Sequence, residues 1–311
     1  MFQLRNRTFL IRSNMVRLDN RISSERNYSN DFCIIFGSCR GLVCLESSGS
    51  ISLWNPSIRK SLIISAKPRN YVLGFGVCNV TNDHKVVKLV YKQNISSRCM
   101  VQPEVEIYSL STRSWRSVSD PAPSNHLVRD FWGYQCFAFG SVHWIASDVN
   151  REGDKYNLVV SFDMSKEVFN KLMFPNSIAN YTRKLSITVL GDSLAALEFM
   201  NWKRGQRSYC VSVMKEYGVS ESWTKLFTVK IPYWLENVTF REDGRIILPL
   251  NNNKLAFCDP ESYDIKDLDN AGDFATYGIF TYTESLVLLK GRSSIPEGMP
   301  NLFAASAAKC S

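Results

Sequence analysis

YSLSTRSW, residues 108–115, is one of five related boxes whose content and spacing indicate the architecture of the chain. Each box combines the end of an apolar strand, a polar turn and the residue that starts the next strand, which is the pattern of a β-hairpin. The other boxes are WNPSIRKS (54–61), FDMSKEVF (162–169), CDPESYDI (258–265) and the longer MKEYGVSESW (214–223). Successive boxes start 54, 54, 52 and 44 residues apart.

A second turn signal precedes each box. These turns begin at Gly41, Asn82-Asp83-His84, Gly140, Gly191 and Gly244, and each introduces an apolar run. Two hairpin turns in a period of roughly 50 residues give four strands per unit, which is the content of a β-propeller blade. The tryptophans Trp54, Trp115 and Trp223 recur at the boxes, so we expect them to pack between blades.

Five such units cover residues 33–268, and strand-like segments remain at both ends of the chain. These segments, TFLIR (8–12) and TYGIFTYTESLVLL (276–289), would be open sheet edges unless they pair with each other. The sequence therefore predicts an all-β propeller of about six four-stranded blades, the last of which is closed by strands from both termini. It assigns residues 1–290 to this propeller domain and residues 291–311 to a flexible C-terminal tail.

The composition of the 311 residues is that of a folded protein, because 45% are apolar and 12% aromatic. Half of the net charge of +8 comes from residues 1–30, where six arginines outnumber two acids, so we expect a basic edge and not a nucleic-acid stripe. The sequence has no signal peptide and no apolar span of about 20 residues, which predicts a cytoplasmic or nuclear location without membrane contact. The nine cysteines include no CxxC pair and are expected to be reduced core thiols.

Three short motifs imitate catalytic sites and are interpreted as turns. Gly191-Asp192-Ser193-Leu194 spells an esterase signature, but the last histidine, His143, precedes the serine. The segment GSCRG (37–41) resembles a nucleophile elbow around Cys39, but it continues as a strand, and nothing predicts a histidine beside this cysteine. The Gly74-Phe75-Gly76 segment lacks the third glycine and the helix of a dinucleotide site. We therefore expect no catalytic residue, no metal and no cofactor.

Taken in order, the boxes and their flanks resemble the F-box-associated domain of plant F-box/kelch-repeat proteins. The similar passages include GSCRGLVCL, LWNPSIRKS, EVEIYSLSTRSWRSV, GSVHWIA, VVSFDMSKEVF and VMKEYGVSESWTKLFTV, and the series covers about residues 8–290. The resemblance implies a substrate receptor of an SCF-type ubiquitin ligase, whose propeller binds the protein to be ubiquitinated. Residues 212–258 look most like the subgroup that includes regulators of plant immune receptors, which implies an immune receptor or another regulatory protein as the partner.

Family members begin with a helical, leucine-rich F-box, whereas this chain starts at what would be the first strand after it. The resemblance therefore implies that the F-box is missing here and that the Skp adaptor binds only if an F-box lies upstream. The paired glycines of kelch repeats are also absent from the sequence, which makes the kelch likeness loose.

Loop lengths predict which side of the propeller binds a partner. In a four-stranded blade the first-to-second and third-to-fourth turns share one face, here called the turn face. The second-to-third loops and the blade connections share the other, the loop face. The long segments, at 92–103, 148–157, 200–208, 119–133, 174–184 and 230–237, all belong to the loop face. Arginines and aromatic residues on such loops are typical interface residues, although any single aromatic could instead belong to the core. The predicted partner-binding residues are Arg98, Trp132, Arg151, Tyr181, Trp202, Arg204, Tyr233 and Trp234.

Two other functions remain open from the sequence. A propeller enzyme of the glycosidase or oxidase type would need convergent carboxylates or metal ligands near the central channel, which the sequence does not identify. An RNA-binding propeller would use the basic loops, and its affinity would fall steeply with salt. The sequence favours non-catalytic protein recognition over both.

Overall fold

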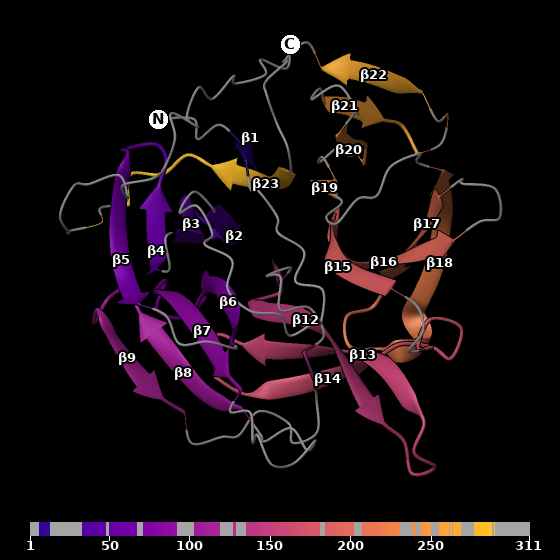
Figure 1. Ribbon diagram of the computed structural model, residues 1–311, viewed down its shortest axis with the longest axis horizontal. Coiled ribbons are helices and arrows are strands. Elements are labelled where there is room, and N and C mark those ends of the chain that lie inside the picture. Colours follow the sequence, from indigo (N-terminus) through magenta and orange to yellow (C-terminus); the bar gives the residue numbers. More distant parts are fainter. Residues whose placement is uncertain are drawn as a thin grey trace, which may run out of the picture.

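The computed structural model describes residues 6–12, 33–47, 50–66, 71–91, 103–118, 127–128, 135–180, 184–201, 207–230, 239–240, 244–249, 255–260, 262, 264–268, 277–287 and 289. In this part of the chain the strands form six antiparallel sheets, and the only helix is the short 3-10 turn η1 (Ser220–Ser222). No helix among these residues is long and apolar enough to cross a membrane. Five of the sheets follow one another around a common axis as blades of a β-propeller (Figure 1).

Each blade is a run of consecutive strands. Blade 1 consists of β2 (Cys33–Cys39), β3 (Leu42–Ser47), β4 (Ser50–Asn55) and β5 (Lys60–Ala66). Blade 2 consists of β6 (Tyr71–Val77), β7 (His84–Val90), β8 (Glu104–Ser109) and β9 (Ser114–Ser117). Blade 3 consists of β10 (Leu127–Val128), β11 (Cys136–Ala138), β12 (Ser141–Val149), β13 (Lys155–Asp163) and β14 (Phe169–Met173). Blade 4 consists of β15 (Lys184–Leu190), β16 (Ser193–Asn201), β17 (Arg207–Met214) and β18 (Trp223–Lys230). Blade 5 consists of β19 (Thr239–Phe240), β20 (Ile246–Pro249), β21 (Leu255–Cys258) and β22 (Ile265–Leu268).

Both predicted turn signals are confirmed in all five blades. The glycine turns and the Asn82 turn join the first strand of a blade to the second, and the boxes join the third strand to the fourth. In blade 3 the first position is divided, since β10 and β11 pair with different halves of β12. The outer strands β5, β9, β18 and β22 lie at the rim of the ring (Figure 1).

The prediction of about six four-stranded blades is wrong in its count. The described residues form five blades, four with four strands and blade 3 with five, and the sixth sheet has only two strands, β1 (Asn6–Arg12) and β23 (Tyr277–Thr283). These strands pair along their whole length, from Asn6 opposite Thr283 to Arg12 opposite Tyr277, so the predicted closure by both termini is confirmed. The count differs because the chain leaves the sheet after β23 and packs against blade 1, where Leu289 joins the apolar core. The predicted tail, residues 291–311, lies outside the described residues.

In blades 1, 2, 3 and 5 the second residue of the box caps the hairpin turn with its side chain. In blade 3, Oδ1 of Asp163 accepts hydrogen bonds of 2.8 Å from the backbone N–H groups of Ser165 and Lys166. Asn55, Ser109 and Asp259 accept the equivalent bonds in blades 1, 2 and 5. Short polar side chains favour this local bonding, which explains why Asn, Ser and Asp occupy this position.

The sixth residue of the box has a left-handed backbone in blades 1, 2 and 3. Its φ is 53° at Arg59, 54° at Arg113 and 60° at Glu167. In blades 2 and 3 its N–H donates to the carbonyl of the capping residue at 2.8 Å. The turn therefore fixes the direction in which this side chain leaves the backbone.

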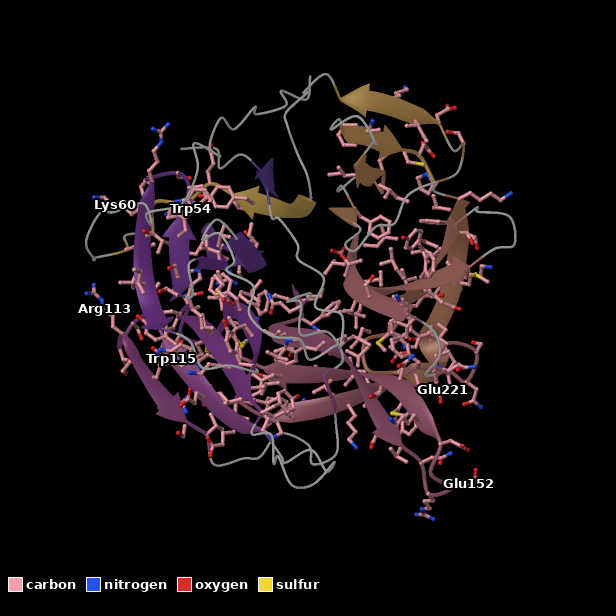
Figure 2. The ribbon with its side chains drawn as sticks, in the orientation of Figure 1. Trp54, Lys60, Arg113, Trp115, Glu152 and Glu221 are labelled. Atoms are coloured by element: carbon pink, nitrogen blue, oxygen red, sulfur yellow. The ribbon has the colours of Figure 1, made fainter. Side chains whose placement is uncertain are left out.

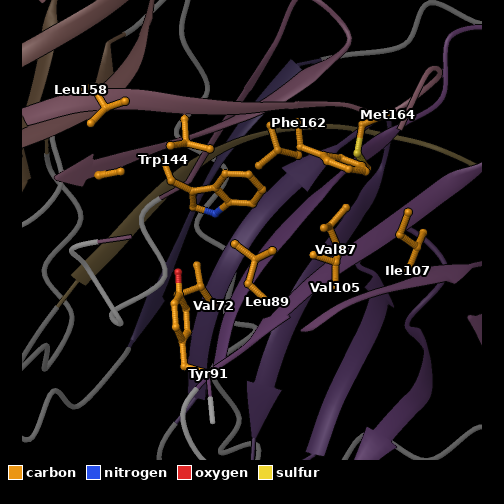
Figure 3. Close-up of a cluster of buried hydrophobic side chains, with 13 residues drawn as sticks. Val72, Val87, Leu89, Tyr91, Val105, Ile107, Trp144, Leu158, Phe162 and Met164 are labelled. Carbon is orange, nitrogen blue, oxygen red and sulfur yellow. The ribbon is translucent and has the colours of Figure 1, made fainter. Parts of the chain in front are cut away.

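The core consists of apolar clusters where neighbouring blades meet. Between blades 2 and 3, Val87, Leu89 and Ile107 face Trp144 and Phe162, as Figure 3 shows. Equivalent clusters join blades 1 and 2, blades 3 and 4, and blades 4 and 5. A blade with a neighbour on each side is therefore buried on both faces of its sheet. This is why most of its strands are apolar at nearly every position and do not alternate with polar residues.

Tryptophan side chains connect blades by hydrogen bonds as well as by packing. The indole Nε1 of Trp115 donates to the carbonyl of Ile64 in blade 1 at 2.7 Å, and Trp223 donates to Met173 in blade 3 at 3.2 Å. Trp54 is buried in blade 1. The predicted role of these box tryptophans between blades is confirmed for Trp115 and Trp223.

Candidate functional site

The loop face is described mainly at the β12–β13 hairpin. Among the predicted binding residues, Arg151 lies at the tip of this hairpin and is exposed. The tip extends past the rim of the ring, where Figure 2 labels the neighbouring Glu152. The other predicted residues, Arg98, Trp132, Tyr181, Trp202, Arg204, Tyr233 and Trp234, lie outside the described residues. Their role in binding stays a prediction.

Asn150 gives the hairpin tip a defined shape. Its side-chain oxygen accepts hydrogen bonds from the N–H groups of Glu152 at 3.0 Å and Asp154 at 2.8 Å. The backbone adds a bond from Asn150 N–H to the Asp154 carbonyl at 2.9 Å, and Gly153 takes the left-handed conformation at φ 90°. The exposed Arg151 side chain is therefore attached to an ordered turn, so that less backbone conformational entropy is lost when a partner binds.

The base of the hairpin is tied to its surroundings. The Asp148 carboxylate accepts hydrogen bonds from the Tyr156 hydroxyl and the Lys171 ammonium, both at 3.2 Å. Burial and this carboxylate raise the pKa of the Tyr156 phenol, which stays protonated as the donor. The buried Asn157 donates through Nδ2 to the carbonyl of Asn180 at 2.8 Å. This bond ties the base of the hairpin to the described start of the connection between blades 3 and 4.

The Cys39 motif is a turn between β2 and β3, as predicted. His84 of blade 2 is buried near the backbone of Cys39 and Arg40, a neighbour that the sequence does not identify, and burial lowers the pKa of its imidazole. Burial raises the pKa of Cys39 to about 12, so the thiol is not an activated nucleophile. All six described core cysteines, including Cys39, are free and buried, as predicted.

Gly191 and Asp192 form the β15–β16 turn, with φ 57° at the glycine. His143 lies in blade 3, fully buried, where Nε2 is 2.8 Å from the Tyr217 hydroxyl and Nδ1 is 3.3 Å from the Cys136 carbonyl. Burial lowers the pKa of His143 to about 4, which keeps it neutral. The histidine therefore joins blades 3 and 4 through Tyr217 on the turn face. Within the described ranges, no group of three His, Cys, Asp or Glu side chains could hold a metal ion.

Inter-blade contacts on the turn face were not predicted from the sequence. Glu167 of blade 3 pairs with Lys85 of blade 2 at 2.8 Å and also with Arg116. Burial alone would raise the pKa of the Glu167 carboxyl, but the contacts with Arg116 and Lys85 outweigh it and hold the pKa below its ordinary value. Arg40 of blade 1 reaches the side chains of Asn79 and Asn82 in blade 2. A box that occurs once in each blade carries no signal for its partners in the next blade, so sequence patterns could not identify these pairs.

Comparison with known proteins agrees with this architecture. Residues 4–286 match the family described as the F-box associated beta propeller domain, and the chain belongs to this family. The F-box protein CPR1 of Arabidopsis thaliana is 32% identical over 286 residues, which cover 82% of this chain and 68% of that protein. The F-box/kelch-repeat protein At3g23880 of Arabidopsis thaliana is 28% identical over 233 residues, covering 70% of this chain and 58% of that protein.

The chain thus spans about two thirds or less of the length of these curated relatives. Among solved structures, a chain of the mitotic checkpoint complex aligns with 84% of this chain and 90% of its own length. Its sequence identity is 9% and its TM-score 0.43, which is too low to support any argument. The family assignment therefore rests on sequence and on the five-bladed architecture.

Proposed function

We propose that the chain is a non-catalytic protein-recognition module, the substrate-receptor part of an SCF-type E3 ubiquitin ligase. The observation that supports this function is the family match across residues 4–286, together with relatives that are F-box proteins. In such a ligase the F-box binds the Skp adaptor and the propeller holds the protein to be ubiquitinated. The Skp adaptor is a partner of this chain only when an F-box precedes the propeller.

Recognition without catalysis is consistent with the state of the reactive side chains. The Cys39 thiol is buried with a raised pKa, and both ring nitrogens of His143 are engaged in contacts at the junction of blades 3 and 4. Ser193 begins β16 directly after a hairpin turn. The motifs at Cys39 and Ser193 therefore have structural roles in the propeller, and Gly74-Phe75-Gly76 lies inside strand β6.

We place the partner on the loop face of blades 2 to 4. The ordered β12–β13 hairpin, with Arg151 and Lys155 exposed, is the described part of this surface. Rigid scaffolds commonly carry their recognition residues on such loops. The proposed partner is a regulatory protein of the cytoplasm or nucleus, with immune receptors as the first candidates to test.

The experiment is affinity purification of the tagged chain from plant cells treated with a proteasome inhibitor. The wild-type chain is compared with the double variant Arg151→Glu/Lys155→Glu, and captured proteins are quantified by mass spectrometry. We expect at least one protein whose capture falls about tenfold with the double variant, because charge reversal at an interface opposes association. The control Lys166→Glu, an exposed change on the turn face, should leave this capture unchanged.

The captured protein is then followed in cells that express the chain behind the F-box of a relative. Its ubiquitination should rise with the wild-type propeller and not with the double variant. Capture that is equal for all three chains, or ubiquitination that does not depend on the propeller, would contradict the proposed function.

A further inference from the structure

The turn face carries large apolar side chains that are open to solvent. Val80 and Leu286 are each 80% exposed, Phe139 is 48% exposed and Tyr217 is 39% exposed. We call these four residues the apolar arc. The other exposed large apolar residues of the described part, Ile63, Val149, Met173, Leu226 and Ile265, lie on outer strands or at the hairpin. Exposed apolar residues that gather on one face commonly mark an interaction site.

The four segments that carry the arc are connected to one another by contacts on the turn face. At one end, the Ser285 side chain packs directly on Gly41, where an added Cβ would lie 1.8 Å from Ser285 Cβ. The neighbouring Arg40 donates to Asn82 at 2.7 Å and to Asn79 at 3.2 Å. The segment that holds Leu286 is thereby connected, through the β2–β3 turn, to the turn that holds Val80.

The other end of the arc continues from the same turn. The Asn79 amide lies 2.8 Å from where a Cβ on Gly140 would stand, so the β6–β7 turn touches the β11–β12 turn. Phe139 precedes Gly140, and its ring centroid is 4.5 Å from that of Tyr217 in blade 4. The apolar arc therefore runs from the segment after β23, across blades 1 to 3, to blade 4.

Basic side chains lie at the turns of blades 1 and 2, on the same turn face as this part of the arc. Arg40, Arg59 and Arg113 are in the turns themselves, while Lys60 begins β5 and Arg116, which pairs with Glu167, lies in β9. The one carboxylate in the same turns, Asp83, is already engaged by the Ser109 hydroxyl at 2.5 Å and the Ser111 N–H at 2.8 Å. Within the described residues, Arg59 and Arg113 have no carboxylate partner.

Arg59 and Arg113 also share the left-handed box position, so the two guanidinium groups leave their turns from equivalent backbone geometry. Figure 2 shows Lys60 and Arg113 pointing away from the ring at blades 1 and 2. The turns of blades 4 and 5 are different, because their exposed charges are mainly the acids Asp192, Glu216, Glu221 and Asp264. The turn face is thus basic on one side of the axis and acidic on the other.

We propose that the turn face is a second protein-binding surface, which takes an acidic segment of a partner protein. The apolar side chains of that segment pack on the apolar arc, and its carboxylates lie over the basic turns of blades 1 and 2. The aromatic members of the arc, Phe139 and Tyr217, pack on each other, and aliphatic Val80 and Leu286 offer a base neither stacking nor hydrogen bonds. The acidic turns of blades 4 and 5 repel phosphates. The surface therefore fits a peptide better than a nucleic acid, and it is separate from the loop face.

The test is an unbiased selection from a phage-displayed library of short peptides on the full chain. Enriched peptides are synthesised with a fluorescent label, and their Kd is measured by fluorescence polarisation. We expect peptides that combine Asp or Glu with large apolar residues. Val80→Ser, Leu286→Ser and Arg113→Glu should each raise the Kd at least about fivefold. The two serine variants remove apolar contacts with the peptide, and Arg113→Glu replaces a positive charge that attracts its carboxylates by a negative one.

The matched controls are Ile63→Ser, an exposed apolar residue on β5, and Arg151→Glu on the loop face; both should keep the Kd within about twofold. Circular dichroism confirms that every variant is folded. The proposal is overturned if enriched peptides lack acidic residues, if none is enriched, or if affinity depends only on Arg151. It is also overturned if labelled single-stranded RNA binds more tightly than any peptide and loses binding with Arg113→Glu, since the surface is then a nucleic-acid site.

Discussion

The side-chain amide of Asn55 lies 3.0 Å from the carbonyl oxygen of Ser285, a residue 230 positions later in the chain. The same amide donates to the carbonyl of Val287 at 2.9 Å, and its oxygen accepts a 3.0 Å bond from the Tyr282 hydroxyl. Asn55 is completely buried. One side chain from a hairpin box thus attaches the segment after β23 to blade 1 and supplements the closure of the ring by β1 and β23.

Replacing Asn55 by alanine should therefore destabilise the whole propeller. The change leaves the carbonyls of Ser285 and Val287 without their donor, and a buried polar group without a partner costs about 1–3 kcal/mol. We expect the free energy of unfolding to fall by about 2–4 kcal/mol in urea denaturation. The exposed control Asn176→Ala should change it by less than about 0.5 kcal/mol. Equal stability of the two variants would show that the segment after β23 is not held by Asn55.

Deleting residues 1–12 should lower both the melting temperature and the solubility. This change removes β1, and β23 then presents an unpaired edge, which is a template for aggregation. Deleting only residues 1–5 leaves β1 intact and is the matched control. The measurements are differential scanning fluorimetry and light scattering. Identical melting of the two shortened chains would contradict closure by the termini.

The sequence predicts the hairpin turns well because each carries a local signal. Glycine or a short polar side chain is required at the turn itself, so both turn types could be placed before the structure was known. Long-range contacts have no such signal. The stretch SLVLL (285–289) has the composition of a strand, but Ser285 and Val287 lie outside the sheet and bond the distant Asn55.

The candidate site could be predicted only in part, because contacts between distant residues leave no local signal in the sequence. Loop length pointed to the β12–β13 hairpin and Arg151, but not to the left-handed backbone of Arg59 and Arg113, where no glycine marks the conformation. His84 of blade 2 lies near the backbone of Cys39 in blade 1, and neither residue reveals the other in the sequence. Patterns within a blade are readable, whereas the pairing between blades depends on three-dimensional packing.

Glu106 should stabilise the fold as the counter-ion of the buried Lys88. Lys88 pairs with Glu106 on the adjacent strand, its side chain is only 8% exposed, and its ammonium lies 4.4 Å from the centre of the Trp115 ring. Glu106→Gln leaves this charge without its counter-ion and should cost about 1–3 kcal/mol of unfolding free energy. The double variant Lys88→Met/Glu106→Gln should recover most of the loss, because no unpaired charge remains. Additive losses in urea denaturation would contradict a coupled pair.

His143 should make the propeller sensitive to acid. Its pKa is lowered to about 4 in the folded protein by burial, against about 6.5 in an unfolded chain. Between these values the unfolded chain binds a proton that the folded chain does not. The free energy of unfolding therefore falls as the pH is lowered from about 6.5 to 4, by about 3 kcal/mol from this group, and keeps its full value above pH 6.5.

The variant His143→Gln isolates this effect, because glutamine can still bond the Tyr217 hydroxyl but does not titrate. Urea denaturation at pH 7.5 and 4.5 should show a decrease about 2–3 kcal/mol smaller in the variant than in the wild type. An equal decrease in both proteins would mean that other groups, such as the buried His84, cause the acid sensitivity.

The loop-face aromatics should hold the partner that the proposed function requires. Long loops on a rigid scaffold commonly serve recognition, and buried aromatic anchors supply most of the energy of an interface. Replacing Trp132, Trp202 or Trp234 singly by alanine should weaken binding of a captured partner by about 1–4 kcal/mol where the residue is an anchor. Arg151→Ala should mainly slow association, because exposed charges steer encounter more than they hold the complex. Surface plasmon resonance separates the two rates, and Ser111→Ala on the turn face should change neither. If the tryptophan variants unfold, these residues are core, and the partner binds elsewhere on the propeller.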